Sequence, residues 1–198
     1  MPTLFPLSPQ MSYHERRADS IGFFSNGGAE PMGRLGQQLV RDDRKALIEA
    51  LTRAYADEWY AHYNYFFVSK TISGPDSPAV SQVLRRKSDR ALIHAERLAE
   101  RIIALGGAPV PKLTDLSKDA TDKPFKLPDN VRDIDGALKA VLDAERTSIR
   151  TYRALSEKIR EKDSVTQALA VELFREAVEG EEEIERLLGE PAPEMDGR

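Results

Sequence analysis

The sequence predicts an all-α fold, a bundle of four long helices with one long crossover connection. Apolar residues recur at alternating steps of three and four through four long segments, the spacing of one face of an α-helix. Short turn signals separate the first helix from the second and the third from the fourth. About 25 residues separate the second helix from the third, enough to span a bundle from end to end. No segment shows a competing strand pattern.

The first predicted helix covers about residues 42–73. The sequence SGPDSP, at 73–78, supplies the stop signal and a start for the next helix. Ser77 is predicted as its N-cap and Pro78 as its first helical residue. The residues expected to face the bundle interior are Leu47, Leu51, Ala54, Glu58, His62, Tyr65 and Ser69.

The second predicted helix covers about residues 78–105, and Gly106, Gly107 and Pro109 end it. Residues 108–135 then form a connection that contains four prolines. Because this connection spans the bundle, the third helix is expected to run parallel to the second. The predicted inward face of the second helix is formed by Leu84, Lys87, Ala91, His94, Leu98, Ile102 and Leu105.

The third and fourth predicted helices cover about residues 135–162 and 164–188, with a cap at Asp163 and Ser164 between them. The third is expected to bury Leu138, Val141 or Leu142, Glu145, Ser148 or Ile149, Tyr152, Leu155 or Ser156, and Ile159. The fourth is expected to bury Leu169, Leu173, Glu176, Gly180, Glu183 or Ile184, and Leu187.

The bundle is therefore expected over residues 41–189, between an N-terminal arm at 1–40 and a C-terminal tail at 190–198. The arm is rich in Pro, Gly and Ser and carries the aromatic residues Phe5, Phe23 and Phe24. We expect it to pack on another surface rather than to be free.

Composition excludes several classes of site. The chain has no cysteine, which excludes disulfides, iron–sulfur clusters and thiolate metal sites. It has no apolar run long enough for a membrane span and no secretion signal at its start, so a cytoplasmic protein is expected. The net charge of −4 and the neutral arm argue against binding to DNA.

Ionisable residues stand near the middle of all four inward faces. They are Glu58, His94 and Glu145 on the first three helices, with Glu176 and Glu183 on either side of the middle of the fourth. Carboxylates gathered in one core repel each other unless cations or protons intervene. Oxygen and imidazole ligands without thiolate favour iron or manganese, so the pattern predicts a metal site.

Four segments carry a family resemblance that covers about residues 40–188. They are ADEWYAHYNYFF at 56–67, IHAERLAERIIALGGAP at 93–109, DAERTSIRTYRAL at 143–155 and VEGEEEIERLL at 178–188. The sequence resembles the bacterioferritin and Dps-like (DNA protection during starvation) branch of the ferritin superfamily. The resemblance implies metal ligands at Glu58, His94 and Glu145, and roles for Tyr65 and Tyr152 in electron transfer or in hydrogen bonds to ligand carboxylates.

The chain departs from the family pattern at three ligand positions. The family has Glu-x-x-His on the second and fourth helices, whereas Ala91, Gly180 and Glu183 stand at three of these four positions. One interpretation is a rearranged site of Glu58, His62, His94, Glu145 and Glu176 or Glu179. A second is a single metal ion in place of two. In a third, the ammonium of Lys87 replaces a metal cation and leaves the site metal-free.

The resemblance implies a protein that binds Fe(II), oxidises it with O2 or peroxide and stores ferric mineral in a hollow homo-oligomeric shell, as part of the response to oxidative stress. Glu58, Glu145 and Tyr65 would serve the oxidation, and Glu58, His62, His94, Glu145, Glu176 and Glu183 would bind mononuclear or dinuclear iron. Twelve subunits are expected rather than 24, because no fifth helix follows Leu188. Haem is not expected, since Leu92 occupies the position of the family's haem-ligating Met.

Two other functions stay open at this point. The chain is alternatively a structural or DNA-protecting shell protein whose ferroxidase site is impaired or absent. A di-metal oxidase or peroxidase that acts alone on a small molecule is the third hypothesis.

Overall fold

A computed structural model describes residue 40 and residues 43–121, 127–160 and 162–189. The expected C-terminal tail and all of the expected N-terminal arm except Val40 lie outside the described residues. Within them the chain is helical and has no strand, which confirms the predicted fold class. The helices are α3 (Arg44–Thr71), α4 (Ser77–Ala104), α5 (Leu113–Asp119), α6 (Ile134–Lys158) and α7 (Ser164–Leu188).

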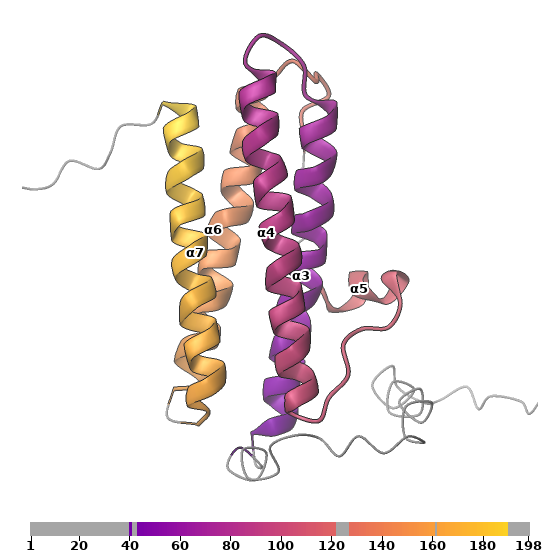
Figure 1. Cartoon of the computed structure of the whole chain (residues 1–198), viewed down its shortest axis with the longest axis vertical. Coiled ribbons are helices and arrows are strands. Elements are labelled where there is room, and N and C mark those ends of the chain that lie inside the picture. Colours follow the sequence, from indigo (N-terminus) through magenta and orange to yellow (C-terminus); the bar gives the residue numbers. More distant parts are fainter. Residues whose placement is uncertain (1–39, 41–42, 122–126, 161, 190–198) are drawn as a thin grey trace, which may run out of the picture. The chain divides into compact units, whose positions relative to one another are not determined.

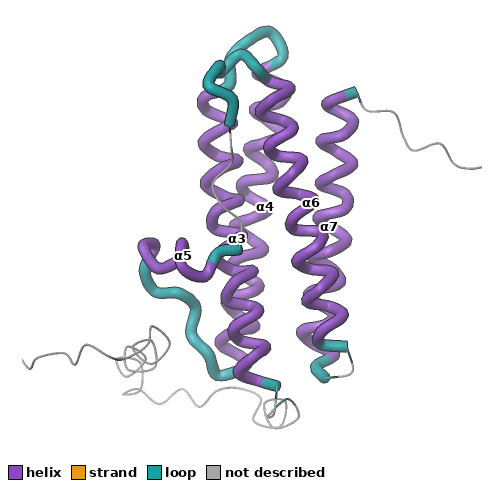
Figure 2. The backbone as a smooth tube through the Cα atoms, turned by 180° about the vertical axis from the view of Figure 1, so that it is seen from behind, coloured by secondary structure: helices purple, strands orange, loops and turns teal. Residues whose placement is uncertain are grey.

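The four long helices form two antiparallel hairpins, α3 with α4 and α6 with α7 (Figure 1). The connection after α4 carries the short helix α5 on the outside of α3 and returns to the other end of the bundle (Figure 2). Consequently α4 and α6 run in the same direction, as the length of the connection predicts. The helix α5 was not predicted from the sequence, because seven residues are too few to show a clear helical period.

The turn between α3 and α4 differs by one residue from the prediction. Asp76, and not Ser77, is the N-cap of α4, so that Pro78 occupies its second position. The hydroxyl of Ser77 donates instead to the carbonyl oxygen of Gly74 at 2.7 Å and starts the helix one residue earlier. Gly74 has a φ of +133°, a conformation that favours glycine, and it reverses the chain here.

The remaining helix ends follow local signals. Gly106 has a φ of +78°, and the backbone N–H of Gly107 donates to the carbonyl of Ile102, which closes α4. The carboxylate of Asp163 accepts hydrogen bonds from the backbone of Val165 and Thr166 and caps α7, as predicted. The prediction for the end of α6 was wrong by four residues, because the helix ends at Lys158 and the backbone N–H of Lys162 donates to the carbonyl of Ile159 before α7 begins.

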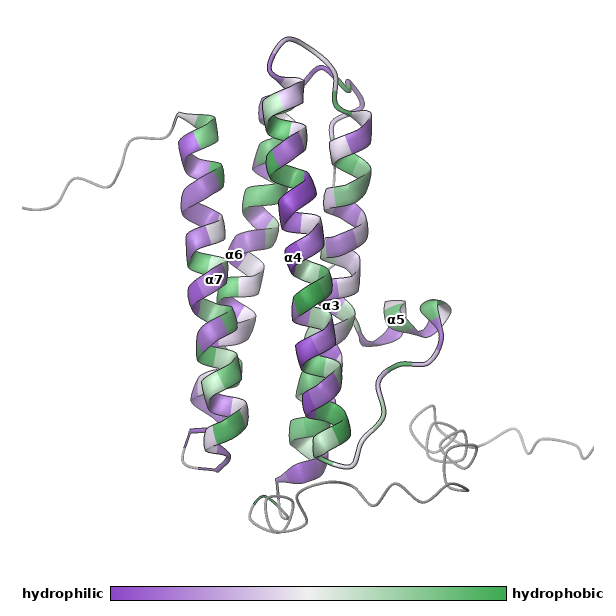
Figure 3. Ribbon diagram, viewed as in Figure 1, coloured by the Kyte–Doolittle hydropathy of each residue, from purple (hydrophilic) through white to green (hydrophobic). Residues whose placement is uncertain are grey.

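Apolar side chains form two clusters in the bundle core. One contains Leu51, Leu98, Ile102, Leu155 and Leu173, and the other contains Val68, Leu84, Leu138, Val141 and Ile184. Polar and apolar residues alternate along every long helix (Figure 3), so each helix buries one face and exposes the other. Four of the polar residues predicted to face inward, Glu58, Lys87, His94 and Glu145, lie on the same faces, between the two clusters in sequence position.

The inward face of α7 differs from the prediction. Its buried residues are Thr166, Ala170, Leu173, Ala177, Gly180 and Ile184. Leu187, expected in the core, is 37% exposed, and Leu169 is only partly buried. Small residues therefore form much of the buried face of α7, and Glu176 and Glu183 lie beside this face rather than at its centre. No helix in the described part of the chain is long and apolar enough to cross a membrane.

Candidate functional site

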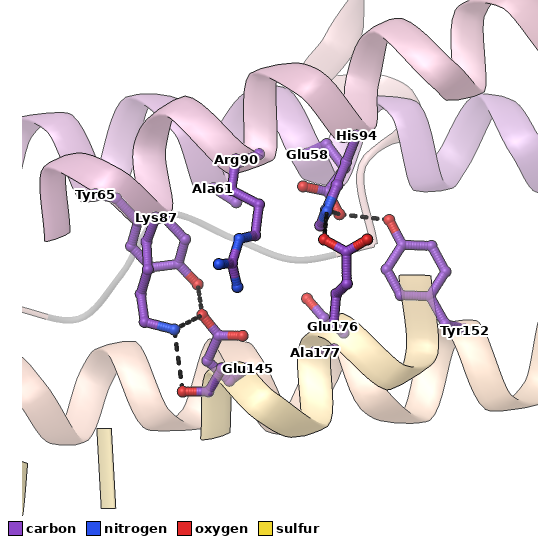
Figure 4. A pocket seen from close by; sticks show the side chains of 13 residues that line it. Glu58, Ala61, Tyr65, Lys87, Arg90, His94, Glu145, Tyr152, Glu176 and Ala177 are labelled. Atoms are coloured by element: carbon purple, nitrogen blue, oxygen red, sulfur yellow. Dashed lines mark hydrogen bonds and ion pairs between the residues drawn. The ribbon is translucent and has the colours of Figure 1, made fainter. Parts of the chain in front are cut away.

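A pocket in the middle of the bundle receives side chains from all four long helices (Figure 4). It lies between residues of the two apolar clusters, so its polar groups are held among aliphatic side chains. The polar residues that line the pocket are Glu58, Tyr65, Lys87, Arg90, His94, Glu145, Ser148, Tyr152 and Glu176. The small residues Ala91 and Gly180 line it as well. The structure thus brings together four of the six predicted metal ligands, Glu58, His94, Glu145 and Glu176.

The first group in the pocket is built around His94 of α4. Its Nδ1 lies 3.4 Å from Oε1 of Glu58, on α3, and its Nε2 lies 2.9 Å from Oε2 of Glu176, on α7. Arg97, one turn further along α4, places Nη1 3.4 Å from the other oxygen of Glu176. The imidazole therefore joins carboxylates from two different helices, one through each ring nitrogen.

Charge within this group changes the pKa of both His94 and Glu176. Burial lowers the pKa of His94, but its interactions with the carboxylates of Glu58 and Glu176 outweigh this effect, and the pKa is raised above its ordinary value. Burial raises the pKa of Glu176, but the hydrogen bond and charge of His94 and the charges of Arg90 and Arg97 bring it below its ordinary value. The protein's own cations thus stabilise the charged forms of this group.

Tyr152 of α6 fixes the other side of Glu58. Its hydroxyl donates a hydrogen bond to Oε1 of Glu58, and the tyrosine side chain is fully buried. Burial, followed by the negative charge of Glu58, raises the pKa of Tyr152 well above its ordinary value. Tyr152 is therefore a neutral donor that orients the Glu58 carboxylate.

The second group in the pocket is built around Glu145 of α6. Oε1 of this carboxylate accepts a hydrogen bond of 2.8 Å from the hydroxyl of Tyr65 and one of 3.1 Å from Nζ of Lys87. Lys87 also donates to the backbone carbonyl of Gly180, on α7, at 3.0 Å. The side chains of Lys87 and Glu145 are 4% and 10% exposed, so this is a buried ion pair.

Two predicted ligands lie outside the pocket. Glu183 lies at the edge of the bundle and is 30% exposed. Its Oε1 is 3.0 Å from Nη2 of the exposed Arg86, and its Oε2 is 3.7 Å from Nζ of Lys87. His62 does not line the pocket, and its Nδ1 contacts the backbone carbonyl of Ser88 at 2.9 Å. Trp59, next to Glu58 on α3, packs beside Ala56, Val110 and Leu116.

Sequence reasoning missed Arg90 as a pocket residue. Figure 4 shows its guanidinium group pointing between the two groups just described. Arg90 follows Lys87 by three residues and precedes His94 by four, the spacing of one helix face, and this signal was present in the sequence. Its charge helps to keep Glu176 ionised.

The pocket does not fit a dinuclear metal centre. Lys87, a cation, is hydrogen-bonded to the carboxylate that would bind one of the two ions, and no carboxylate replaces those missing at Ala91 and Gly180. Among the described residues no group of three or more His, Cys, Asp or Glu side chains is arranged to hold a metal ion.

Comparison with known proteins agrees with this architecture. The model of the ferritin-like domain matches residues 48–192. The DNA protection during starvation protein of Pyrococcus furiosus is 30% identical over 153 residues, which cover 76% of this chain and 81% of that protein.

Solved structures are similar to the bundle as well. The dodecameric thioferritin of Bacteroides fragilis, a bacterioferritin-related protein, has a TM-score of 0.75 at 24% identity and covers 79% of this chain and 94% of its own. Dps from Thermosynechococcus elongatus has a TM-score of 0.69 at 18% identity, and the match covers 82% of this chain and 99% of that chain. The helical bundle, the family match and the curated relative together show that this chain belongs to the ferritin-like family and is a Dps homologue.

Proposed function

We propose that this chain is a subunit of a hollow homo-oligomeric shell that takes up and stores iron, and that each subunit binds one Fe(II) ion between Glu58 and His94. Fe(II) is here the substrate and not a resident cofactor. The proposal excludes the paired oxidation of two ions within one subunit.

The relation of Glu58 to His94 is the observation that carries this proposal. Two ligands that each lie about 2.1 Å from one ion are themselves about 3 to 3.5 Å apart. Oε1 of Glu58 and Nδ1 of His94 are separated by 3.4 Å and come from two neighbouring helices. This separation suits a shared ion better than it suits a direct hydrogen bond.

Glu176 supports the same interpretation from the other side of the imidazole. A histidine that binds a metal usually donates its second ring N–H to a carboxylate, which fixes the tautomer and the ring orientation. Glu176 lies 2.9 Å from Nε2 and is placed to accept that hydrogen bond. We therefore assign Glu176 to positioning His94 rather than to binding iron, and metal binding at Nδ1 displaces a proton from the imidazole.

A single ion per subunit has a chemical consequence. Reduction of O2 to hydrogen peroxide takes two electrons, and each Fe(II) gives up only one. A subunit with one ion cannot supply both electrons within its own pocket, so it oxidises Fe(II) more slowly than a dinuclear site. Storage of ferric iron then depends on the assembled shell and on growth of the mineral inside it.

The shell itself is supported by the relatives. The Bacteroides fragilis protein is described as dodecameric, and its structure matches almost the full length of the present bundle. We expect twelve copies of the 22.2 kDa chain, about 270 kDa in total. Light scattering on the purified protein measures this mass directly, and a monomer in solution would contradict the proposal.

A stoichiometric Fe(II) titration tests the site. Fe(II) is added in steps, first without oxygen to measure binding and then in air to follow ferric absorbance. We expect one Fe(II) retained per subunit after desalting, and Glu58→Gln should abolish this binding. Glu182→Gln is the matched control, because Glu182 is 59% exposed, does not line the pocket and should leave the stoichiometry unchanged.

Each outcome separates the hypotheses. Rapid oxidation that saturates at two irons per subunit would contradict the proposal and indicate a rebuilt dinuclear centre. An assembled shell that binds no Fe(II) in its subunits would favour the second candidate, a structural shell protein. The cations Lys87, Arg90 and Arg97 favour that candidate, because they neutralise much of the carboxylate charge without metal.

A further inference from the structure

Lys87 is a buried cation in the centre of the bundle. Lysine is almost never fully buried unless it is paired, because removing an ammonium group from water is costly. The side chain of Lys87 is nevertheless only 4% exposed and reaches across the bundle from α4 to α6 and α7. The side chain does not extend to the surface, so its positive charge interacts with groups inside the bundle.

The surroundings of the ammonium group resemble a set of oxygen ligands. Nζ lies 3.1 Å from Oε1 of Glu145, 3.0 Å from the carbonyl oxygen of Gly180 and 3.7 Å from Oε2 of Glu183. Tyr65 donates a further hydrogen bond to Glu145 and directs this carboxylate toward Lys87. Three oxygen atoms from two helices therefore surround one positive charge.

We propose that the ammonium group of Lys87 permanently replaces one of the two metal ions that a dinuclear carboxylate centre would hold, with Glu145 as its counterion. The covalently attached cation neutralises Glu145 and keeps a second divalent ion out through like-charge repulsion. Glu145, which the sequence suggested as a metal ligand, is on this proposal a structural partner of Lys87.

The small residues around Lys87 belong to the same arrangement. A Cβ atom on Gly180 would lie 2.4 Å from Oε2 of Glu145 and 3.0 Å from Nζ of Lys87, so any other residue at this position would force the ion pair to shift. Ala91, one turn after Lys87, lines the same pocket without adding a negative charge. Positions 91 and 180 thus lack carboxylates, and the ammonium group of Lys87 beside them supplies the positive charge that a metal ion would supply.

This inference does not depend on iron binding by Glu58 and His94. Those two residues form the other group in the pocket, and Lys87 contacts neither of them in the structure. Failure of the Fe(II) titration would leave the role of Lys87 intact, and the reverse also holds.

The first test compares the thermal unfolding of one lysine variant with that of one arginine variant. Lys87→Met keeps the length and apolar stem of the side chain but removes the charge. We expect its unfolding midpoint to fall by about 10 °C, because the Glu145 carboxylate loses its buried partner. The matched control is Arg175→Met on α7, whose ion pair with Glu179 has both side chains more than half exposed. Its midpoint should change by less than about 2 °C.

The second test measures Mn²⁺ binding, because Mn²⁺ prefers oxygen ligands. Mn²⁺ should raise the midpoint of Lys87→Met by at least about 5 °C more than that of the wild type. Equilibrium dialysis should show one more Mn²⁺ per subunit in Lys87→Met than in the wild type. Addition of Glu145→Gln to Lys87→Met should remove the extra ion.

The single variant Glu145→Gln keeps the inference testable even if Lys87→Met fails to fold. In the wild-type background this change should leave the number of bound Mn²⁺ ions unchanged, because the Glu145 carboxylate pairs with Lys87 and not with a metal ion. Loss of a bound Mn²⁺ in Glu145→Gln would overturn the proposal. Equal midpoints and equal Mn²⁺ binding in Lys87→Met and the wild type would overturn it as well.

Discussion

Oε2 of Glu145 faces the backbone of Gly180 so closely that a β-carbon at position 180 would lie only 2.4 Å from it. Gly180 is in the interior of α7, where glycine is normally less favourable than alanine by about 1 kcal/mol. Helix propensity and packing thus predict opposite effects of alanine at this position, and the structure decides the sign.

Gly180→Ala should therefore destabilise the protein. We expect the overpacking to outweigh the gain in helix propensity and to lower the free energy of unfolding by about 1–3 kcal/mol. Chemical denaturation at one protein concentration measures it. The control Val171→Ala replaces an exposed residue of the same helix and should change the free energy by less than about 0.5 kcal/mol. A more stable Gly180→Ala protein would show that the Lys87–Glu145 pair is not packed as described.

Tyr152→Phe should destabilise the pocket through Glu58. Removal of the hydroxyl leaves a buried carboxylate with one donor fewer, at a cost of about 1–2 kcal/mol. Denaturant unfolding measures this difference, with Tyr63→Phe as the control because Tyr63 is 63% exposed. Equal losses in the two variants would mean that the Tyr152 hydroxyl does not orient Glu58.

Asp163 should make stability depend on acidic pH. Burial raises the pKa of this carboxyl group, but hydrogen bonds from Thr166 and Arg101 outweigh it and bring the pKa below its ordinary value. A pKa that is lower in the folded state stabilises the fold above the unfolded value of about 3.9. This contribution is lost as the pH falls through the lower, folded-state value.

The unfolding midpoint measured between pH 7 and pH 3 tests this expectation. The wild-type midpoint should decline below about pH 4, as Asp163 becomes protonated. Asp163→Asn keeps a capping oxygen but lacks the charge that pairs with Arg101 at 2.6 Å. The variant should start from a lower midpoint at pH 7 and lose less on acidification. Parallel curves for the two proteins would assign the acid sensitivity to other carboxylates.

Charge predicts that the shell does not retain DNA at physiological salt. The chain carries a net charge of −4, and electrostatic attraction to phosphates supplies most non-specific affinity. A gel-shift assay at about 150 mM salt should show free DNA, whereas a basic DNA-binding protein serves as the positive control. Retardation that weakens steeply with added salt would contradict this prediction and indicate a basic surface on the assembled shell.

Much of the bundle follows from local sequence. The step of three and four identifies the inward faces of α3, α4 and α6. The cap at Asp163 and the turn at Gly74 depend on neighbouring residues only. The inward face of α7 was harder, because Ala170, Ala177 and Gly180 carry little apolar signal although they are buried. Leu187 was predicted to be buried because it is apolar, but it lies on the exposed face of the helix.

The sequence by itself identified Glu58, Lys87, His94 and Glu145 as residues that enter the bundle, since all four occupy inward positions of regular helices. It also predicted His62 and Glu183 there, which do not line the pocket, and it missed Arg90. Only the tertiary structure decided their partners. The pairing of Lys87 with Glu145 and of His94 with Glu176 depends on how helices far apart in the sequence pack and on which neighbours lack a side chain. Periodicity assigns a residue to a face, whereas a distance of about 3 Å between charged atoms requires the positions of two helices at once.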